Sequence, residues 1–325
     1  MDVLSRRGFL SAAVTGTAGA LVARAHASMA PYAEGPGLAL SGFRGTLCLF
    51  SKLLPDLPAG ELGRALAALG FGGVDLTVRP GGHVVPERAA VDLPPFLAVV
   101  REEGLEVPMI TTGLLSAADP TARPILETAG HHQVRFFKPG YYRYAFVDVR
   151  KELESASADL RGLAALAAEC GVQLGYHNHA GYLGGPVWDI ARVIEALDPR
   201  WVGYYFDVRH AVVEGGDGGW RAVLNLIAPR LKMVAVKDFF WEKGPKGWEQ
   251  RNCPLGQGMV DWKEFFSALA RGGFHGPVSL HIEYEIPGPA RVKRENSLAA
   301  AAQDLAFLKA GLARAYAGEG AAPRG

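Results

Sequence analysis

The sequence predicts an α/β protein folded as a (β/α)8 barrel, the TIM barrel. From Gly45 onward, short β-rich runs alternate with longer helical stretches at intervals of roughly 30 residues, the spacing of right-handed βαβ units on a parallel sheet. Eight such units in a chain of 325 residues suit a closed barrel better than an open doubly wound sheet. The first strand is followed by Ser51-Lys52-Leu53-Leu54, which lacks the glycines of a dinucleotide- or phosphate-binding loop.

Each barrel element has its own signal. Helices are expected to alternate with the strands, and several end at a glycine, which a helix C-cap prefers. Asp261, followed three residues later by Glu264, predicts a capping box at the start of a further helix. The expected strands are 46–50, 73–78, 107–111, 133–137, 172–177, 201–207, 231–237 and 277–283, and the expected helices include 61–69, 95–103, 149–170, 187–197, 219–228 and a closing helix at 297–315.

The first 27 residues resemble a twin-arginine export signal. Arg6-Arg7 stands before an uncharged run at 11–23, and the segment ends in Ala25-His26-Ala27. The run is shorter than the roughly 20 apolar residues that cross a bilayer, which disfavours a membrane anchor. We therefore expect a signal peptide at 1–27, a linker at 28–44, the barrel at 45–315 and a flexible tail at 316–325. The mature protein would be periplasmic or extracellular, without stable membrane insertion.

Composition narrows the class of partner. The hydrophobic content of 49% can fill the core of a large soluble domain, and the formal net charge is only +1. Basic residues are scattered, which disfavours a nucleic-acid partner, because phosphate binding needs a concentrated basic surface. Cys48, Cys170 and Cys253 lie far apart and predict neither a disulfide framework nor a zinc ribbon.

Ionisable side chains gather where the last four predicted strands end. Side chains alternate between the two faces of a strand, so those opposite the apolar, helix-facing set point into the barrel. Burying a charge without a partner is costly, so four neighbouring strands that each end in an inward ionisable residue indicate a functional site. The inward set is His177 and His179, Tyr205 and Asp207, Lys237, and Ser279, His281 and Glu283.

Each of these residues also has a purely structural interpretation. His177 and His179 could be one satisfied barrel histidine and one loop histidine. Asp207 could cap the turn that follows it, and Lys237 could be the buried ion-pair partner of Asp207 or Glu283. Their convergence on one face of the barrel favours the functional interpretation of the whole set.

At these residues the chain resembles the xylose isomerase-like TIM-barrel superfamily, which includes tagatose epimerase-like and inosose dehydratase-like enzymes. The resemblance covers about 45–315 and implies a TIM barrel with its site at the ends of strands five to eight. It is fairly specific for the superfamily and does not single out one reaction. It rests on YHNH at 176–179, FDVRH at 206–210, VKD at 236–238, PLGQGMVDW at 254–262 and HIE at 281–283.

The resemblance also implies a divalent metal, which epimerase members hold through Glu, Asp, His and Glu after strands five to eight. Asp207 and Glu283 match, whereas His179 replaces the first Glu and Lys237 replaces the His. A protonated lysine about 4 Å from a divalent ion would be repelled by several kcal/mol. In one alternative Lys237 is neutral or turned away, and His179, Asp207 and Glu283, with His210 or His177, hold manganese, zinc or cobalt. In the other no metal is bound and Lys237 itself supplies the positive charge. We favour the metal site.

The sequence thus predicts an isomerase, epimerase or lyase that acts on a sugar, polyol or keto-sugar. It would remove a proton beside a carbonyl and pass through an enediolate stabilised by the metal or by Lys237. Glu283 is the expected base, and His177 or His179 the second acid/base. The expected substrate-binding residues are Asn178, Arg209, His210, Asp238 and Trp241.

Two further alternatives remain open. The segment 239–276, with Trp241 and Trp248, is expected to form a lid over the sugar, unless its tryptophans only pack the loop. The rival function is a non-catalytic carbohydrate-binding or scaffold protein that keeps the barrel without the epimerase metal ligands. The sequence leaves a homo-oligomer open.

Overall fold

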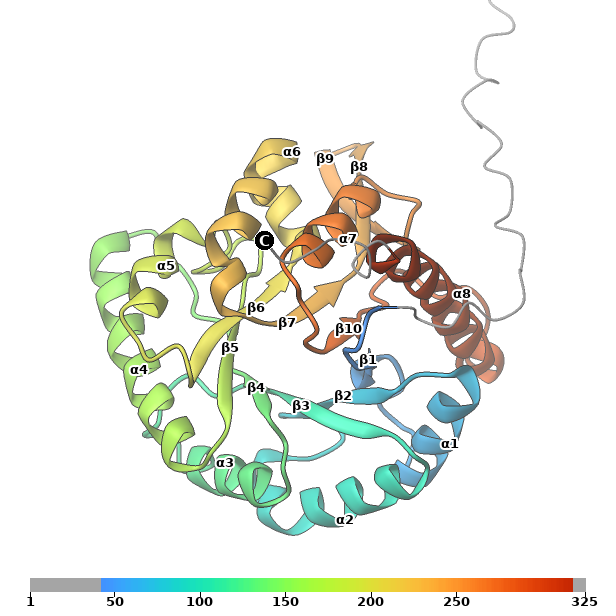
Figure 1. Cartoon of the computed structure of the whole chain (residues 1–325), viewed down its shortest axis with the longest axis horizontal. Coiled ribbons are helices and arrows are strands. Elements are labelled where there is room, and N and C mark those ends of the chain that lie inside the picture. The colour runs from blue at the N-terminus through green and yellow to red at the C-terminus, as the bar shows by residue number, and fades with distance from the viewer. Residues whose placement is uncertain (1–41, 318–325) are drawn as a thin grey trace, which may run out of the picture. The chain divides into compact units, whose positions relative to one another are not determined.

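The computed structural model describes residues 42–317, which form a closed parallel barrel surrounded by helices (Figure 1). Around the barrel the strands follow the order β1-β10-β7-β6-β5-β4-β3-β2. The fold prediction is confirmed, and each expected strand overlaps one barrel strand. The barrel strands are β1 (Leu47–Phe50), β2 (Gly73–Val78), β3 (Glu106–Thr112), β4 (Phe136–Lys138), β5 (Gln173–His177), β6 (Val202–Asp207), β7 (Leu231–Val236) and β10 (Val278–Leu280).

The helices follow the strands in alternation and cover the outside of the barrel (Figure 1). The predicted N-cap is present, since the Asp261 side chain accepts a hydrogen bond from the Glu264 backbone N–H at the start of α7. The Glu264 side chain accepts from Arg271 instead of completing a capping box. The helices are α1 (Ala59–Leu69), α2 (Ala89–Glu102), α3 (Ala122–His131), α4 (Val149–Glu169), α5 (Trp188–Glu195), α6 (Val208–Ile227), α7 (Trp262–Arg271) and α8 (Ala290–Tyr316).

Several helices begin earlier than the sequence predicted, and the difference is largest for α6 and α8. α6 starts at Val208, directly after β6, because Asp207 caps it by accepting from the His210 N–H. The glycines near its middle hid this start, and Gly216 (φ 60°, ψ −162°) does interrupt the helix there. α8 begins at Ala290 rather than near 297.

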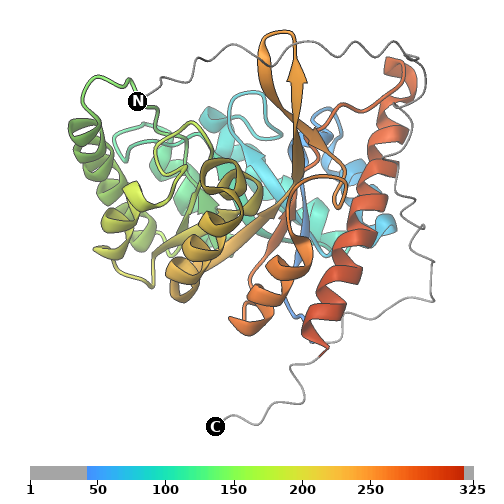
Figure 2. The same ribbon diagram turned by 90° about the horizontal axis from the view of Figure 1, so that it is seen from above.

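The segment expected to be a lid forms an antiparallel hairpin of β8 (Asp238–Gly244) and β9 (Gly247–Cys253). β8 begins two residues after β7 ends, so the base of the hairpin lies at the C-terminal end of the barrel strands. Figure 2 shows the hairpin standing out from the barrel beside the upper part of α8. The rest of the segment contains α7.

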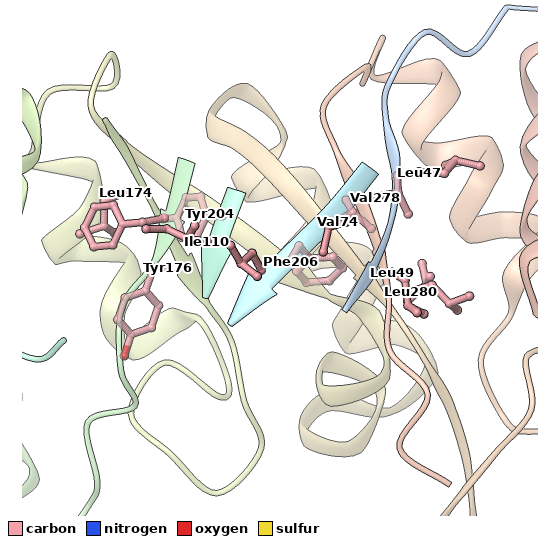
Figure 3. Packing of buried hydrophobic residues seen from close by; sticks show 14 of the residues in the cluster. Leu47, Leu49, Val74, Ile110, Leu174, Tyr176, Tyr204, Phe206, Val278 and Leu280 are labelled. Atoms are coloured by element: carbon pink, nitrogen blue, oxygen red, sulfur yellow. The ribbon is translucent and has the colours of Figure 1, made fainter. Parts of the chain in front are cut away.

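Alternate residues of the strands face opposite environments. Those that face outward pack beneath the helices in one large core (Figure 3). The inward residues form a smaller apolar cluster inside the barrel, where the Met233 side chain packs over Gly175 and a Cβ at Gly175 would displace its terminal methyl group. The outward set includes Leu47, Leu49, Val74, Leu174, Tyr204, Phe206 and Leu280, and the inward cluster is Met109, Phe136, Tyr205, Met233 and Ala235.

The packed domain is slightly longer than expected. Phe43 and Tyr316 are both buried and their rings meet edge to face, so the packing includes residues assigned to the linker and the tail. All three cysteines are free thiols. Among residues 42–317, no helix is long and apolar enough to cross a membrane. The expected signal peptide and most of the expected linker lie outside the described residues.

Candidate functional site

Two cavities lie where β5, β6, β7 and β10 end. The larger has a volume of about 560 Å³ and lies among the loop after β5, the first turns of α6 and the base of the hairpin. The smaller has a volume of about 90 Å³ and reaches toward the ends of β1, β2 and β4. His179, Lys237 and Glu283 line both cavities, so the two form one continuous candidate site.

Asp207 is fully buried at the end of β6 and accepts several hydrogen bonds. Its Oδ1 caps α6, and its Oδ2 lies 3.3 Å from His177 Nε2 and 3.3 Å from Lys237 Nζ. Burial alone would raise the pKa of Asp207, but Lys237, His210 and His177 together outweigh it and hold the pKa well below its usual value. Asp207 is therefore an ionised carboxylate that both caps a helix and holds Lys237.

Lys237 joins two carboxylates. In addition to its contact with Asp207, the Nζ of Lys237 lies 2.8 Å from Oε2 of Glu283. The other carboxylate oxygen of Glu283, Oε1, lies 3.0 Å from Lys52 Nζ. Burial opposes ionisation of Glu283, but chiefly Lys237 holds its pKa far below the usual value. The side chain of Lys237 is 4% exposed and that of Glu283 is 21% exposed. Lys237 is thus a buried, doubly paired cation, whereas part of Glu283 stays open to the cavity.

These residues do not fit the divalent metal that the sequence suggested. The Lys237 ammonium stands between Asp207 and Glu283, the two carboxylates that would have to be metal ligands. A metal at contact distance from both would meet this ammonium and be repelled. Across residues 42–317, no group of three or more His, Cys, Asp or Glu side chains is arranged to hold a metal ion.

His177, His179 and His210 differ in their hydrogen bonds. His177 is buried, and its Nδ1 lies 2.7 Å from the Tyr141 hydroxyl while its Nε2 faces the Asp207 carboxylate. Asp207 only accepts, so Nε2 carries the proton of the neutral ring and Nδ1 accepts from Tyr141. Burial lowers the pKa of His177 to about 3, although Asp207 opposes this shift. Both nitrogens of His177 are therefore occupied by protein partners.

His179 and His210 each leave one nitrogen free. Nδ1 of His179 lies 3.0 Å from the Ala180 carbonyl, which only accepts, so Nε2 holds a lone pair. Nδ1 of His210 accepts from Arg209, so its Nε2 carries the proton. Within the described residues, this Nε2 and Nε of Arg209 are buried without hydrogen-bond partners, although Oδ2 of Asp207 lies 3.7 Å from His210 Nε2. Both residues line the larger cavity, so they can donate to a ligand there.

Two expected substrate-binding residues instead organise the protein. The Asn178 side chain pairs with both the N–H and the carbonyl of Asp207, which ties the end of β5 to β6. The buried carboxylate of Asp238 accepts from the N–H groups of Phe239, Gly256, Gly258 and Val260 and from the indole of Trp262. Neither residue lines a cavity. Both side chains bond mainly to backbone groups, and a single sequence does not reveal such partners.

Arg209 and Trp241, two further residues expected to bind substrate, lie in different surroundings. Arg209 donates to Asn252 at the base of the hairpin and lies over the Phe239 ring, with Cζ 4.8 Å from the centroid. It lines the larger cavity, as expected. Trp241 is 38% exposed and Trp248 is 66% exposed, and neither lines a cavity. The hairpin contributes Gln250 and Asn252 to the wall rather than its tryptophans.

The sequence analysis missed the cations at the ends of the earlier strands. Lys52, Arg79 and Lys138 follow or end β1, β2 and β4, and all three line the smaller cavity together with Tyr141. Their position at the C-terminal ends of barrel strands was the available signal, because a TIM barrel builds its site from those ends.

Comparison with known proteins agrees with this architecture. A family model described as a xylose isomerase-like TIM barrel matches residues 64–311. An inosose dehydratase of Geobacillus thermodenitrificans is 33% identical over 137 residues, which is 39% of this chain and 45% of that protein. An inosose dehydratase of Lacticaseibacillus casei is 26% identical over 145 residues, 41% of this chain and 48% of that protein. The chain thus matches about half the length of these curated relatives.

Solved structures align over most of the barrel. An L-ribulose 3-epimerase has a TM-score of 0.63 at 20% identity, covering 86% of this chain and 99% of that one. A 3-keto-D-glucoside 4-epimerase from E. coli has a TM-score of 0.62 at 17% identity, covering 82% and 99%. A Mycobacterium smegmatis protein in complex with magnesium has a TM-score of 0.61 at 18% identity, covering 86% and 99%. At these identities the similarity concerns the fold.

The family model spans most of the barrel, including all four strands that end at the larger cavity, β5, β6, β7 and β10. The chain belongs to the xylose isomerase-like TIM barrel family.

Proposed function

We propose that the protein is an enzyme of the isomerase, epimerase or lyase type that moves a proton beside the carbonyl of a sugar, keto-sugar or polyol-derived ketone. The observation that carries this proposal is the cavity wall, where a paired but accessible carboxylate, Glu283, lies beside a buried cation, Lys237, and two neutral histidines. Base, positive charge and hydrogen-bond donor are what enolisation needs. The inosose dehydratases and epimerases among the similar proteins support this class.

The geometry suggests a division of labour. Glu283 takes the proton from carbon, and Nε2 of His179, with its lone pair, is the second acid/base. Lys237 and the unpartnered Nε2–H of His210 face the carbonyl oxygen as it gains negative charge. Glu283 has a low pKa and is a weak base, so it depends on these donors to make the carbon acid stronger.

This assignment replaces the metal with Lys237. The fixed ammonium sits where the developing oxyanion needs a positive charge and is held there by Asp207 and Glu283. His177 positions Asp207 and Tyr141, because both of its nitrogens are already bonded to them. No step of the proposed proton transfer needs a metal ion.

A hydrogen-exchange screen tests the function. The protein is incubated in deuterated water with a panel of keto-sugars and inososes, and deuterium at the carbon beside the carbonyl is followed by NMR. An enzyme of this class exchanges that hydrogen with at least one substrate, even where the overall equilibrium hides turnover. Binding of a sugar without any exchange across the panel would favour the non-catalytic carbohydrate-binding alternative.

A further inference from the structure

Two cations beside the proton-transfer residues lack an acidic partner. Arg79 follows β2 and Lys138 ends β4, and both line the smaller cavity. Lys138 is 2% exposed. Within residues 42–317, the side chains of Arg79 and Lys138 form no ion pair and no hydrogen bond, in contrast to Lys237, which pairs with two carboxylates. A buried lysine without a partner is rare, because desolvation of its charge is not compensated.

Aromatic faces hold these two cations in place. Nζ of Lys138 lies 3.3 Å from the centroid of the Tyr141 ring, and Cζ of Arg79 lies 5.5 Å from that of Phe50. Ring faces attract cations but leave their N–H groups without acceptors. The donors are therefore oriented and unsatisfied.

The protein does not compensate the positive charge of Lys138. Burial lowers the pKa of Lys138 well below its usual value, and Arg79 and Lys237 lower it further, against the opposite effect of Asp75. A negatively charged group bound beside Lys138 would favour its charged form. The charged residues that line the smaller cavity are Lys52, Arg79, Lys138 and Lys237, with Glu283 as the one carboxylate. A cavity with this excess of positive charge attracts an anion.

We propose that Arg79 and Lys138 form a subsite for an anionic group of the substrate, a carboxylate or a phosphate. The proposal rests on the proposed function in that the same substrate reaches Glu283. With a volume of about 90 Å³, against about 560 Å³ for the larger cavity, the smaller cavity suits a compact group such as a carboxylate or phosphate better than a sugar ring. It shares His179, Lys237 and Glu283 with the larger cavity, which takes the remainder of the molecule.

Calorimetric titration with matched probes tests this subsite. The probes are D-gluconate, D-glucose 6-phosphate, inorganic phosphate and the neutral D-glucitol, all at one ionic strength. The parent protein is expected to bind at least one anionic probe ten times more tightly than glucitol. Gluconate and glucose 6-phosphate distinguish a carboxylate from a phosphate preference. Equal affinity for neutral and anionic probes would overturn the proposal.

Three variants locate the binding. Arg79→Gln and Lys138→Met should each lower the affinity for the preferred anionic probe at least tenfold and leave the affinity for glucitol unchanged. Arg200→Gln is the control, because it removes an exposed cation before β6, and it should change neither the affinity for the anionic probe nor that for glucitol. Lys138→Met should keep or raise the melting temperature, because it removes an uncompensated buried charge, so lost binding would not reflect unfolding. Anion binding that survives both site variants would contradict the assignment.

The outcome separates the subsite from the catalytic proposal. Anion binding that depends on Arg79 and Lys138, without hydrogen exchange on any substrate, would support the subsite and contradict the proposed enzyme. Exchange on neutral sugars alone, unaffected by Arg79→Gln, would support the enzyme and overturn the subsite.

Discussion

Lys237 and Glu283, at the ends of the neighbouring strands β7 and β10, form a 2.8 Å ion pair at the wall of the larger cavity. The lysine is almost fully buried, while a fifth of the glutamate side chain remains exposed. The pair therefore presents its carboxylate to a ligand, while its largely buried ammonium also lines the cavity. Because Asp207 holds the same ammonium, the positive charge of the site is fixed by the protein.

The first prediction concerns metal independence. We expect the parent enzyme to contain less than stoichiometric divalent metal and to retain its hydrogen-exchange rate after dialysis against EDTA. Lys237→His replaces the repelling ammonium with an imidazole beside Asp207 and Glu283, and this variant should bind about one zinc or manganese ion per chain. Elemental analysis of both proteins gives the answer. One tightly bound ion in the parent, lost together with activity on chelation, would restore the metal site.

The second prediction assigns the base. Glu283→Gln keeps the shape of the side chain and removes its basicity, so hydrogen exchange should slow by at least the roughly hundredfold typical of losing a general base. Substrate affinity should change much less than the rate. Glu285→Gln is the matched control, because Glu285 is exposed and lies two residues further along the chain. Exchange at the parent rate in Glu283→Gln would remove Glu283 from the mechanism.

The third prediction is an acid-tolerant pH profile. Burial, followed by the charge of Lys237, lowers the pKa of His179 to about 4, and burial lowers that of His177 to about 3. Both rings therefore stay neutral from pH 8 down to about pH 5. We expect kcat/KM for hydrogen exchange to be level over this range and to fall only as pH approaches 4. An inflection near pH 6.5 would show an ordinary histidine in the essential step.

The fourth prediction concerns export. The N-terminal segment lies outside the described residues, and we propose its function from the sequence alone. Replacing both Arg6 and Arg7 with lysine should leave full-length precursor in the cytoplasm, because the arginine pair is what the twin-arginine route reads. Cell fractionation and immunoblotting compare the parent with the variant. Unchanged export and processing of the variant would exclude this route.

The barrel could be predicted from the sequence because its signal is repeated. Each strand is a short buried run, and the outward apolar residues of β6 and β10 alternate with the inward polar ones. That alternation alone gave the inward direction of Asp207, His281 and Glu283, and His281 does lie inside, where it contacts Tyr205 and Ser279. Local periodicity carries this information without any knowledge of neighbouring strands.

The partners of the site residues could not be predicted in the same way. Whether Asn178 faces a ligand or the backbone of Asp207 depends on how β5 and β6 are aligned. Lys138 is similar: a lysine after a short apolar run is usually solvated, and its burial follows from the closed barrel and the ring of Tyr141. Metal binding was favoured from the resemblance, whereas the geometry of Lys237 supports the alternative that the sequence had left open.

The last prediction concerns stability and lies outside the cavities. Asp304 of α8 is buried and accepts from the Leu255 N–H and the Tyr284 hydroxyl. Burial, opposed by these hydrogen bonds and aided by Asp238, raises its pKa to about 7. The folded state thus binds a proton that the unfolded chain releases near pH 4, so this contribution to stability is present below pH 4 and is lost as pH rises to 7.

Asp304→Asn removes this pH dependence, because the amide stays neutral. Relative to the parent, the free energy of unfolding of the variant should rise by roughly 2.7 kcal/mol between pH 5 and pH 8. The parent loses its Asp304 contribution over the two pH units up to the pKa of about 7, and one pKa unit corresponds to 1.36 kcal/mol. Urea unfolding at both pH values measures the difference, and Glu154→Gln on the exposed face of α4 controls for a general change in charge. Because the other buried carboxylates are common to both proteins, their titration cancels in the comparison. A difference between Asp304→Asn and the parent that is the same at pH 5 and pH 8 would show that Asp304 has an ordinary pKa in the folded protein.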